Sequence, residues 1–149
     1  MSTAYKHTCI IASDWKRLAR FYQEVLGCVF LPPERDLSGE WVERITGVRG
    51  ARIRGAHLRL PGHGDSGPTL EIYQYETNEP GSSPAANREG LGHLAFEVED
   101  VETATREVLA RGGGQVGEIV SLEAVGGGER TIAYVTDPEG NIVELQSVR

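Results

Sequence analysis

The chain has 149 residues, with 22 acidic against 15 basic side chains, a net charge of −7 and 39% hydrophobic residues. These values describe one ordinary globular domain that is long enough to bury a core, and no run of about 18 apolar residues offers a membrane-spanning helix. The acidic balance and the absence of a Lys/Arg cluster argue against nucleic acid as a partner.

The first residues, Met1–His7, lack the charged-then-apolar pattern of an export signal, so we expect a soluble cytoplasmic protein with no membrane partner. Cys9 and Cys28 form no CxxC pair, and we expect both to be reduced thiols in the core. The 19 glycines indicate many turns and therefore many short strands.

An internal repeat organises the chain, and each copy runs from a His to an Asp seven residues later. The two copies are His7–Asp14 and His93–Asp100. Each Asp is a candidate N-cap for a helix, because apolar residues at helical spacing follow it. We expect the first helix to end at Gly27 and the second at 112–114, since glycine commonly follows the last helical residue.

The two halves match again downstream, where a Glu stands four residues after a Gly. These pairs are Gly67 with Glu71 and Gly140 with Glu144. Further strand-like runs lie between each helix and the end of its half. They cover residues 28–32, 51–60, 115–120 and 129–136. Each half is therefore expected to contain a strand, a helix and three more strands.

A stretch rich in Pro, Gly and Ser, at about 77–90, is expected to link a first module at about 4–76 to a second at about 91–149. Each module is small, so we expect residues 1–149 to form a single α+β domain. The first module carries additional residues within 36–50. There Trp41 and Ile45, four residues apart, predict a short extra helix.

Strand alternation places the repeated His and Glu side chains away from the helices. Phe96 shares the helix-facing side with its apolar neighbours, which leaves His93 opposite. Leu145 leaves Glu144 opposite in the same way, and Leu70 leaves Glu71 opposite. The repeated polar side chains can therefore line one concave sheet surface. They are His7, Glu71, His93 and Glu144.

An ionised Glu between aliphatic neighbours on a half-buried strand is costly unless its charge is compensated, and two in one cavity repel each other. A divalent cation removes both costs. Two neutral imidazoles and two carboxylates suit Zn, Ni, Co, Mn or Fe(II). The sequence therefore predicts one divalent metal ion on these four side chains, with open positions for a small-molecule substrate. Taken singly, each side chain is more simply a solvated strand residue.

Four further residues are candidates for substrate binding. Tyr73 lies two residues after Glu71 and would face the same cavity. Trp41 either covers the substrate or anchors the core. His57 and Arg59 either contact the substrate or lie on an exposed strand face. His63, in a Gly-rich turn, is expected to be exposed.

Five segments together carry a family pattern. They are His7 with the strand after it, Phe21–Gly27, Leu70–Tyr73, Gly90–Val98 and Asp137–Leu145. This pattern resembles the vicinal oxygen chelate superfamily, which includes glyoxalase I, methylmalonyl-CoA epimerase, extradiol dioxygenases, fosfomycin-resistance transferases and bleomycin-binding proteins. The resemblance covers nearly the whole chain except roughly 36–50.

The resemblance implies two βαβββ modules that form a cupped mixed sheet around one metal ion, and a homodimer. The order His, Glu, His, Glu is similar to glyoxalase I. It implies a metal-dependent lyase, isomerase or epimerase that stabilises an enediolate or enolate of a small substrate with vicinal oxygens. Glu144, or alternatively Glu71, would be the catalytic base, and Glu43 is a third possibility. The first strand reads Cys9–Ala12, where glyoxalase I usually has an Arg for the glutathione carboxylate.

Two other branches of the superfamily give alternative functions. An Fe(II) extradiol-type dioxygenase would use His7, His93 and Glu144 as ligands, with Glu71 only a neighbour. A non-enzymatic, drug-binding resistance protein would need no metal, and the retained ligand set argues against that branch.

Overall fold

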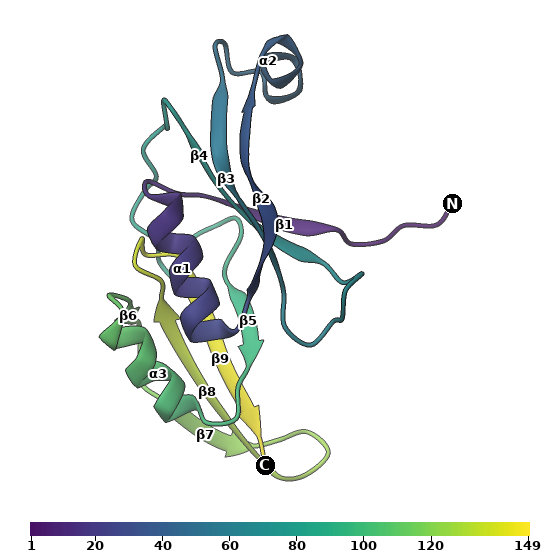
Figure 1. Ribbon diagram of the computed structural model, residues 1–149. Helices are drawn as coiled ribbons and strands as arrows, with labels where there is room; N and C mark the ends of the chain where they lie inside the picture. The colour runs from purple at the N-terminus through teal and green to yellow at the C-terminus, as the bar shows by residue number, and fades with distance from the viewer. The chain divides into compact units, whose positions relative to one another are not determined.

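The computed structural model describes residues 1–149 and divides into two compact units, Met1–Pro80 and Gly81–Arg149. Each unit combines a β-sheet with α-helix, so the predicted α+β class is confirmed (Figure 1). None of the helices has both the length and the apolar character that crossing a membrane requires.

The first unit is a four-stranded mixed sheet with two helices. Its strands are β1 (His7–Ile11), β2 (Val29–Ser38), β3 (Arg52–Arg59) and β4 (Thr69–Tyr75). They lie in the order β1-β4-β3-β2, with β1 parallel to β4 and the other neighbours antiparallel. Helix α1 (Trp15–Leu26) packs against β3 and β4, and α2 (Glu40–Thr46) lies at the end of β2 (Figure 1).

Helix α1 begins and ends as the sequence predicts. The Asp14 carboxylate accepts a hydrogen bond from the backbone amide of Arg17 at 3.0 Å, which satisfies one of the free donors of the first turn. Gly27 has a φ of 67°, the left-handed conformation that favours glycine. Leu18 and Tyr22 are fully buried between these ends, so this face of α1 covers the sheet.

The segment 36–50 contains the predicted helix and also lengthens a strand. Residues 36–38 continue β2 and pair with residues 52–54 of β3, before α2 begins. Val42 is the buried residue of α2 and belongs to a small apolar cluster, whereas the Trp41 residue is 57% exposed. Trp41 is therefore not a core anchor.

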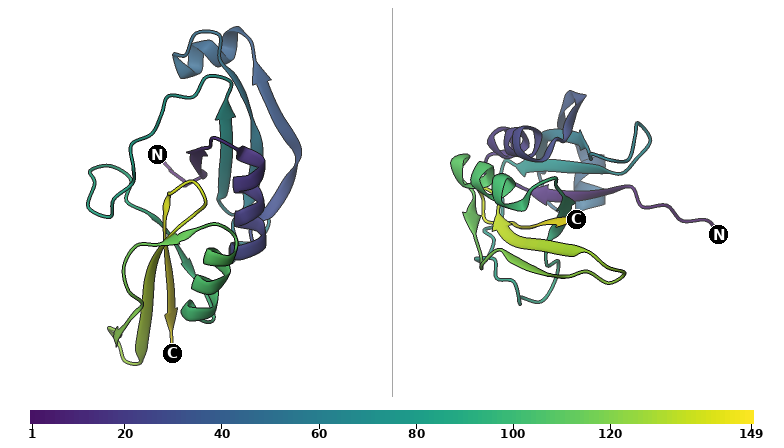
Figure 2. Two further views of the ribbon diagram at one scale, coloured as in Figure 1. Left: turned by 90° about the vertical axis from the view of Figure 1, so that its left-hand side faces the viewer. Right: turned by 90° about the horizontal axis from the view of Figure 1, so that it is seen from below.

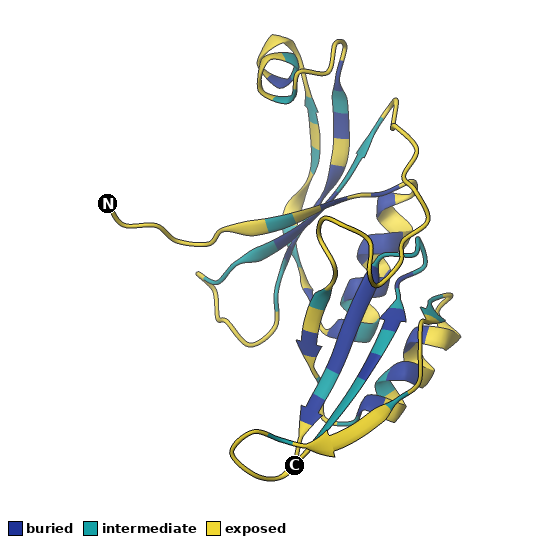
Figure 3. Ribbon diagram, turned by 180° about the vertical axis from the view of Figure 1, so that it is seen from behind, coloured by how far each residue is buried: buried dark blue, intermediate teal, exposed yellow.

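The second unit is a five-stranded sheet with one helix. Its elements are β5 (Leu94–Glu97), α3 (Val101–Ala110), β6 (Gly114–Gln115), β7 (Val120–Glu123), β8 (Glu129–Thr136) and β9 (Ile142–Val148). The order is β5-β9-β8-β6, with β7 also paired to β8. Helix α3 begins at the predicted cap Asp100 and lies alongside β8 and β9 (Figure 2). Strand β9 is mostly buried, whereas β7 is exposed throughout (Figure 3).

Two predictions about these elements are wrong. The single strand expected at 115–120 is broken into β6 and β7, because the chain leaves the edge of β8 after Gln115 and pairs with β8 again only from Val120. Cys28 is buried as expected, but Cys9 is exposed. Cys9 lies on the edge strand β1, on the same side as His7, and this side does not pack on α1.

Candidate functional site

The face of the first sheet that is free of α1 carries His7 and Glu71 on neighbouring parallel strands. Nδ1 of His7 lies 3.5 Å from Oε1 of Glu71. The Glu71 residue is only 9% exposed, between the fully buried Leu70 and Ile72. Strand alternation sends those two aliphatic side chains to α1 and Glu71 to the opposite face, as the sequence predicts.

His57 joins this pair from β3, where it is the register partner of Glu71. Its Nε2 lies 3.3 Å from Oε1 of Glu71 and 2.5 Å from the hydroxyl of Tyr73. On the other side of the ring, Nη2 of Arg35 lies 3.4 Å from Nδ1. Because a guanidinium can only donate, Nδ1 accepts this contact and Nε2 carries the proton of the neutral ring.

Burial and nearby charges determine the protonation states of His57 and Tyr73. Partial burial lowers the pKa of His57, against the opposite effect of the Glu71 carboxylate, and the positive charge of Arg35 adds to the lowering. Burial of the hydroxyl, together with the negative charge of Glu71, raises the pKa of Tyr73 to about 12. The Tyr73 hydroxyl therefore keeps its proton at neutral pH and accepts a hydrogen bond from Nε2–H of His57, which is a neutral imidazole.

Gly55 makes room for this arrangement. A Cβ at this position would lie 2.1 Å from the carbonyl oxygen of Ile72 and 2.5 Å from the Tyr73 ring. Gly55 and Tyr73 are register partners, so the ring lies against the bare backbone of β3. The Tyr73 hydroxyl can then reach His57.

The second unit repeats the His–Glu pairing. Nε2 of His93, just before β5, lies 2.9 Å from Oε2 of Glu144 on β9, and Glu144 is 9% exposed. Strands β5 and β9 are parallel neighbours, as β1 and β4 are in the first unit. The ring of Tyr134 contacts His93, with centroids 4.9 Å apart.

Sequence reasoning missed two arginines that contact these groups. Nη2 of Arg130 lies 3.5 Å from Oε1 of Glu144 and also donates to the side chain of Gln146. Strand alternation along β8 places Arg130 on the same face as Tyr134, the register partner of Glu144, but only the register of β8 on β9 brings Arg130 close to Glu144. Strand alternation does not predict the face on which Arg35 lies, because the register of β2 on β3 shifts between Leu31 and Arg35.

Within each His–Glu pair, the distance between the nitrogen and oxygen donors would allow both to bind the same metal ion. Two donors that each bind one ion at about 2.1 Å lie about 3.0 Å apart at a right angle and about 3.4 Å apart at a tetrahedral angle. The N–O separations in the two pairs are 3.5 and 2.9 Å. Each unit supplies one pair, and no group of three or more His, Cys, Asp or Glu side chains is arranged as a complete metal site.

The remaining candidates lie apart from the pairs or beside them. Trp41 lines an apolar pocket together with Tyr73. The Arg59 guanidinium forms an ion pair with Asp65 on the adjoining turn. His63 is exposed, as expected.

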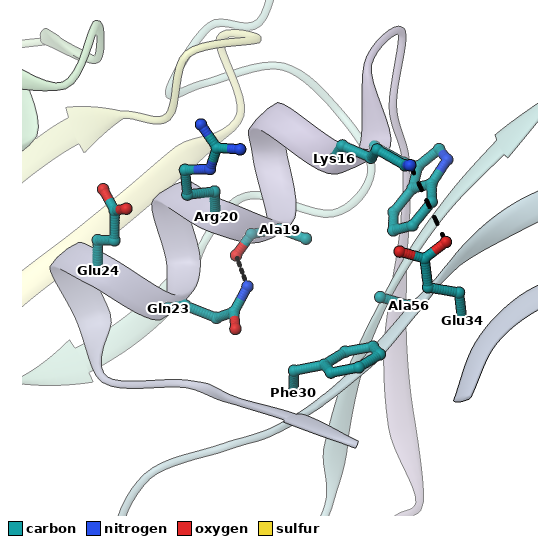
Figure 4. Close-up of a pocket in the computed structure, with 9 residues that line it drawn as sticks. Lys16, Ala19, Arg20, Gln23, Glu24, Phe30, Glu34 and Ala56 are labelled. Atoms are coloured by element: carbon teal, nitrogen blue, oxygen red, sulfur yellow. Dashed lines mark hydrogen bonds and ion pairs between the residues drawn. The ribbon is translucent and has the colours of Figure 1, made fainter. Parts of the chain in front are cut away.

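A larger cavity, of about 380 Å³, lies on the other side of the first sheet, between α1 and strands β2 and β3 (Figure 4). Its rim carries the ion pair of Lys16 with Glu34, at 4.0 Å, and the hydrogen bond of the Gln23 amide to the carbonyl of Ala19, at 3.2 Å. None of the predicted site residues lines it. We therefore place the candidate site on the opposite face, with Glu71.

The comparison with known families covers almost the whole chain. Residues 4–145 match the family model of the glyoxalase/bleomycin resistance protein/dioxygenase superfamily. The chain belongs to this superfamily. The family resemblance predicted from the sequence is confirmed, and the observed sheets and helices are those of the glyoxalase fold.

Individual proteins are similar to this superfamily member over most of their length, one of them in sequence and two in fold. A lactoylglutathione lyase from Haemophilus influenzae is 28% identical over 141 residues, which cover 93% of this chain and 88% of the relative. A glyoxalase family protein from Bacillus cereus has a TM-score of 0.77 at 21% identity, covering 98% of this chain and 93% of that one. The fosfomycin resistance protein FosX from Listeria monocytogenes, in complex with Mn(II) and sulfate, has a TM-score of 0.58 at 16% identity, covering 100% and 95%.

Proposed function

We propose that this glyoxalase-like protein is a divalent-metal-dependent isomerase, epimerase or lyase acting on a small substrate with two vicinal oxygens. The observation that carries the proposal is the repeated pair of a His and a buried Glu, His7 with Glu71 and His93 with Glu144. The metal site of four ligands expected from the sequence, His7, Glu71, His93 and Glu144, remains a prediction. The cytoplasmic location and the homodimer expected from the sequence remain predictions.

The burial of the two carboxylates supports a cation. Each Glu is 9% exposed, and an ionised carboxylate at that depth is costly unless a positive charge compensates it. Glu144 has a guanidinium nearby, at 3.5 Å, but the contacts of Glu71 are with the imidazoles of His7 and His57. The imidazole nitrogens and carboxylate oxygens of this set are suitable ligands for Zn, Ni, Co, Mn or Fe.

A bound divalent cation would supply Lewis-acid stabilisation of negative charge on two adjacent substrate oxygens. The side chains of the protein would do the rest. Glu144 is the base that we favour, with Glu71 as the alternative: the carboxylate would accept the proton from the substrate carbon and hold it on Oε. The Tyr73 hydroxyl would donate a hydrogen bond to a substrate oxygen, and His57, Arg59 and Trp41 are proposed substrate contacts.

Elemental analysis of the untreated full-length chain, followed by proton exchange, tests this proposal. We expect close to one divalent ion per chain, and exchange of the carbon-bound protons of hydroxyacetone or of the methylglyoxal–glutathione hemithioacetal in D2O, followed by NMR. Glu144→Gln should reduce exchange at least about 100-fold, in the range that a general base contributes. Glu102→Gln, an exposed Glu on α3, is the matched control.

Other outcomes would contradict the proposal in different ways. Full metal occupancy without exchange on either substrate would refute the chemistry. Iron in the purified protein, with oxygen uptake on a catechol, would favour the dioxygenase alternative. Apolar drug binding by a metal-free protein would favour a resistance protein.

A further inference from the structure

The sheet face that carries Glu71 becomes apolar toward α2. A pocket of about 290 Å³ lies there between α2 and strands of the first sheet. Its lining includes Ile11 on β1, Leu37 on β2, Ile53 on β3 and Trp41 and Ile45 on α2. No Asp, Glu, Lys, Arg or His lines it.

Tyr73 connects this pocket to the polar group. Its ring is part of the pocket lining, and its hydroxyl lies 2.5 Å from Nε2 of His57, which contacts Glu71. Cys9, the register partner of Glu71, is also in the lining. The apolar pocket and the Glu71 carboxylate therefore share one continuous surface of the same unit.

Three large apolar side chains around this pocket are exposed. The exposed fraction is 50% for Ile11, 57% for Trp41 and 76% for Ile45. Single exposed apolar residues are common on protein surfaces, but a group around one hollow marks a binding site. Val42 on α2 and Ile53 on β3 also line the pocket and are buried, so its walls are well packed.

We propose that this pocket binds an uncharged apolar group of the substrate, an aryl or branched alkyl group, while the oxygens of the same substrate lie at Glu71. This inference rests on the proposed function. Pockets for whole small molecules measure roughly 300–1,000 Å³, so about 290 Å³ suits one part of a substrate. Glutathione, which has two carboxylates, would find no cation in this lining to pair with.

The first test uses the metal-free, full-length protein and the uncharged fluorescent probe N-phenyl-1-naphthylamine. We expect the probe to bind and to quench Trp41, so that the tryptophan signal change is lost in Trp41→Phe while buried Trp15 still emits. Ile45→Ser should weaken binding about tenfold, because one apolar contact of the probe is removed. Leu109→Ser, an equally simple change of an exposed leucine on α3, should leave binding unchanged.

Two kinds of result in this experiment would contradict the proposal. Absence of probe binding, or equal binding by Ile45→Ser and the natural protein, would overturn the proposal. A dimer that Ile45→Ser dissociates, without any probe binding, would show instead that a second copy of the chain covers this face.

The second test separates this inference from the proposed function. Zinc-loaded protein is titrated with acetohydroxamate and with benzohydroxamate, two chelators that present adjacent oxygens. We expect benzohydroxamate to bind at least about tenfold more tightly, and Ile45→Ser to remove most of this gain. If acetohydroxamate binds and benzohydroxamate gains nothing, the apolar pocket is refuted alone. If neither binds, the metal-dependent function is refuted, and the probe experiment still decides the pocket.

Discussion

The hydroxyl of Tyr73 and Oε1 of Glu71 both lie within hydrogen-bonding reach of one atom, Nε2 of His57, at 2.5 and 3.3 Å. Tyr73 and Glu71 are two residues apart on β4, and His57 is the register partner of Glu71 on β3. The imidazole therefore connects a residue of the apolar pocket to a predicted metal ligand, and it is itself contacted by Arg35 at 3.4 Å.

Replacement of His57 should weaken metal binding. In His57→Phe the ring is kept but the donor facing Glu71 is lost, so the carboxylate is held less firmly. We expect the zinc dissociation constant to rise about tenfold, the lower end of the range for residues that orient metal ligands. Competition with a chromophoric chelator measures it. His63→Phe, on an exposed turn, is the control, and an unchanged zinc affinity in His57→Phe would show that His57 does not position Glu71.

Replacement of Arg130 should have the opposite effect. The guanidinium lies 3.5 Å from Oε1 of Glu144, so it repels a cation held by that carboxylate. We expect Arg130→Gln to tighten zinc binding about fivefold at low salt and less at high salt, since ions screen the repulsion. Arg130→Lys keeps the charge and should change the affinity little. Weaker zinc binding by Arg130→Gln would mean that Arg130 supports the site by orienting Glu144.

Gly55→Ala should destabilise the protein. The added methyl group would lie 2.1 Å from the Ile72 carbonyl oxygen and 2.5 Å from the Tyr73 ring, so backbone or ring must shift. We expect the free energy of unfolding to fall by about 2–3 kcal/mol, a typical cost of overpacking. Urea unfolding measures it. Gly81→Ala, where an added Cβ meets nothing within 4 Å, should lie close to the natural protein.

The start of α3 should lose stability in acid. The pKa of Asp100 lies below its ordinary value of 3.8, mainly because its carboxylate accepts a hydrogen bond from the Thr103 amide, with help from Arg149. A lowered pKa stabilises the folded state above the ordinary value, and this contribution disappears as the pH falls through the lowered one. The stability difference between the natural protein and Asp100→Ala in urea should therefore shrink from pH 6 to pH 3. A constant difference would contradict the shift.

The sequence by itself determined the local features of this protein. Asp14 and Gly27 mark the ends of α1 because capping depends on residues within one turn. The alternation of β4 fixed that Glu71 and Tyr73 face away from α1, since neighbouring residues in a strand point to opposite sides. The repeat of this pattern predicted that Glu144 also faces away from the helix of its half, and the structure places its Oε2 2.9 Å from Nε2 of His93.

Only the tertiary structure decided which side chains surround each Glu. His57 reaches Glu71 because β3 and β4 pair in one particular register, and Arg35 reaches His57 because β2 is irregular before it. Arg130 stands beside Glu144 for the same kind of reason. Periodicity along one strand gives the face of a side chain but not its neighbours across strands. Those depend on the register between segments that are far apart in the sequence.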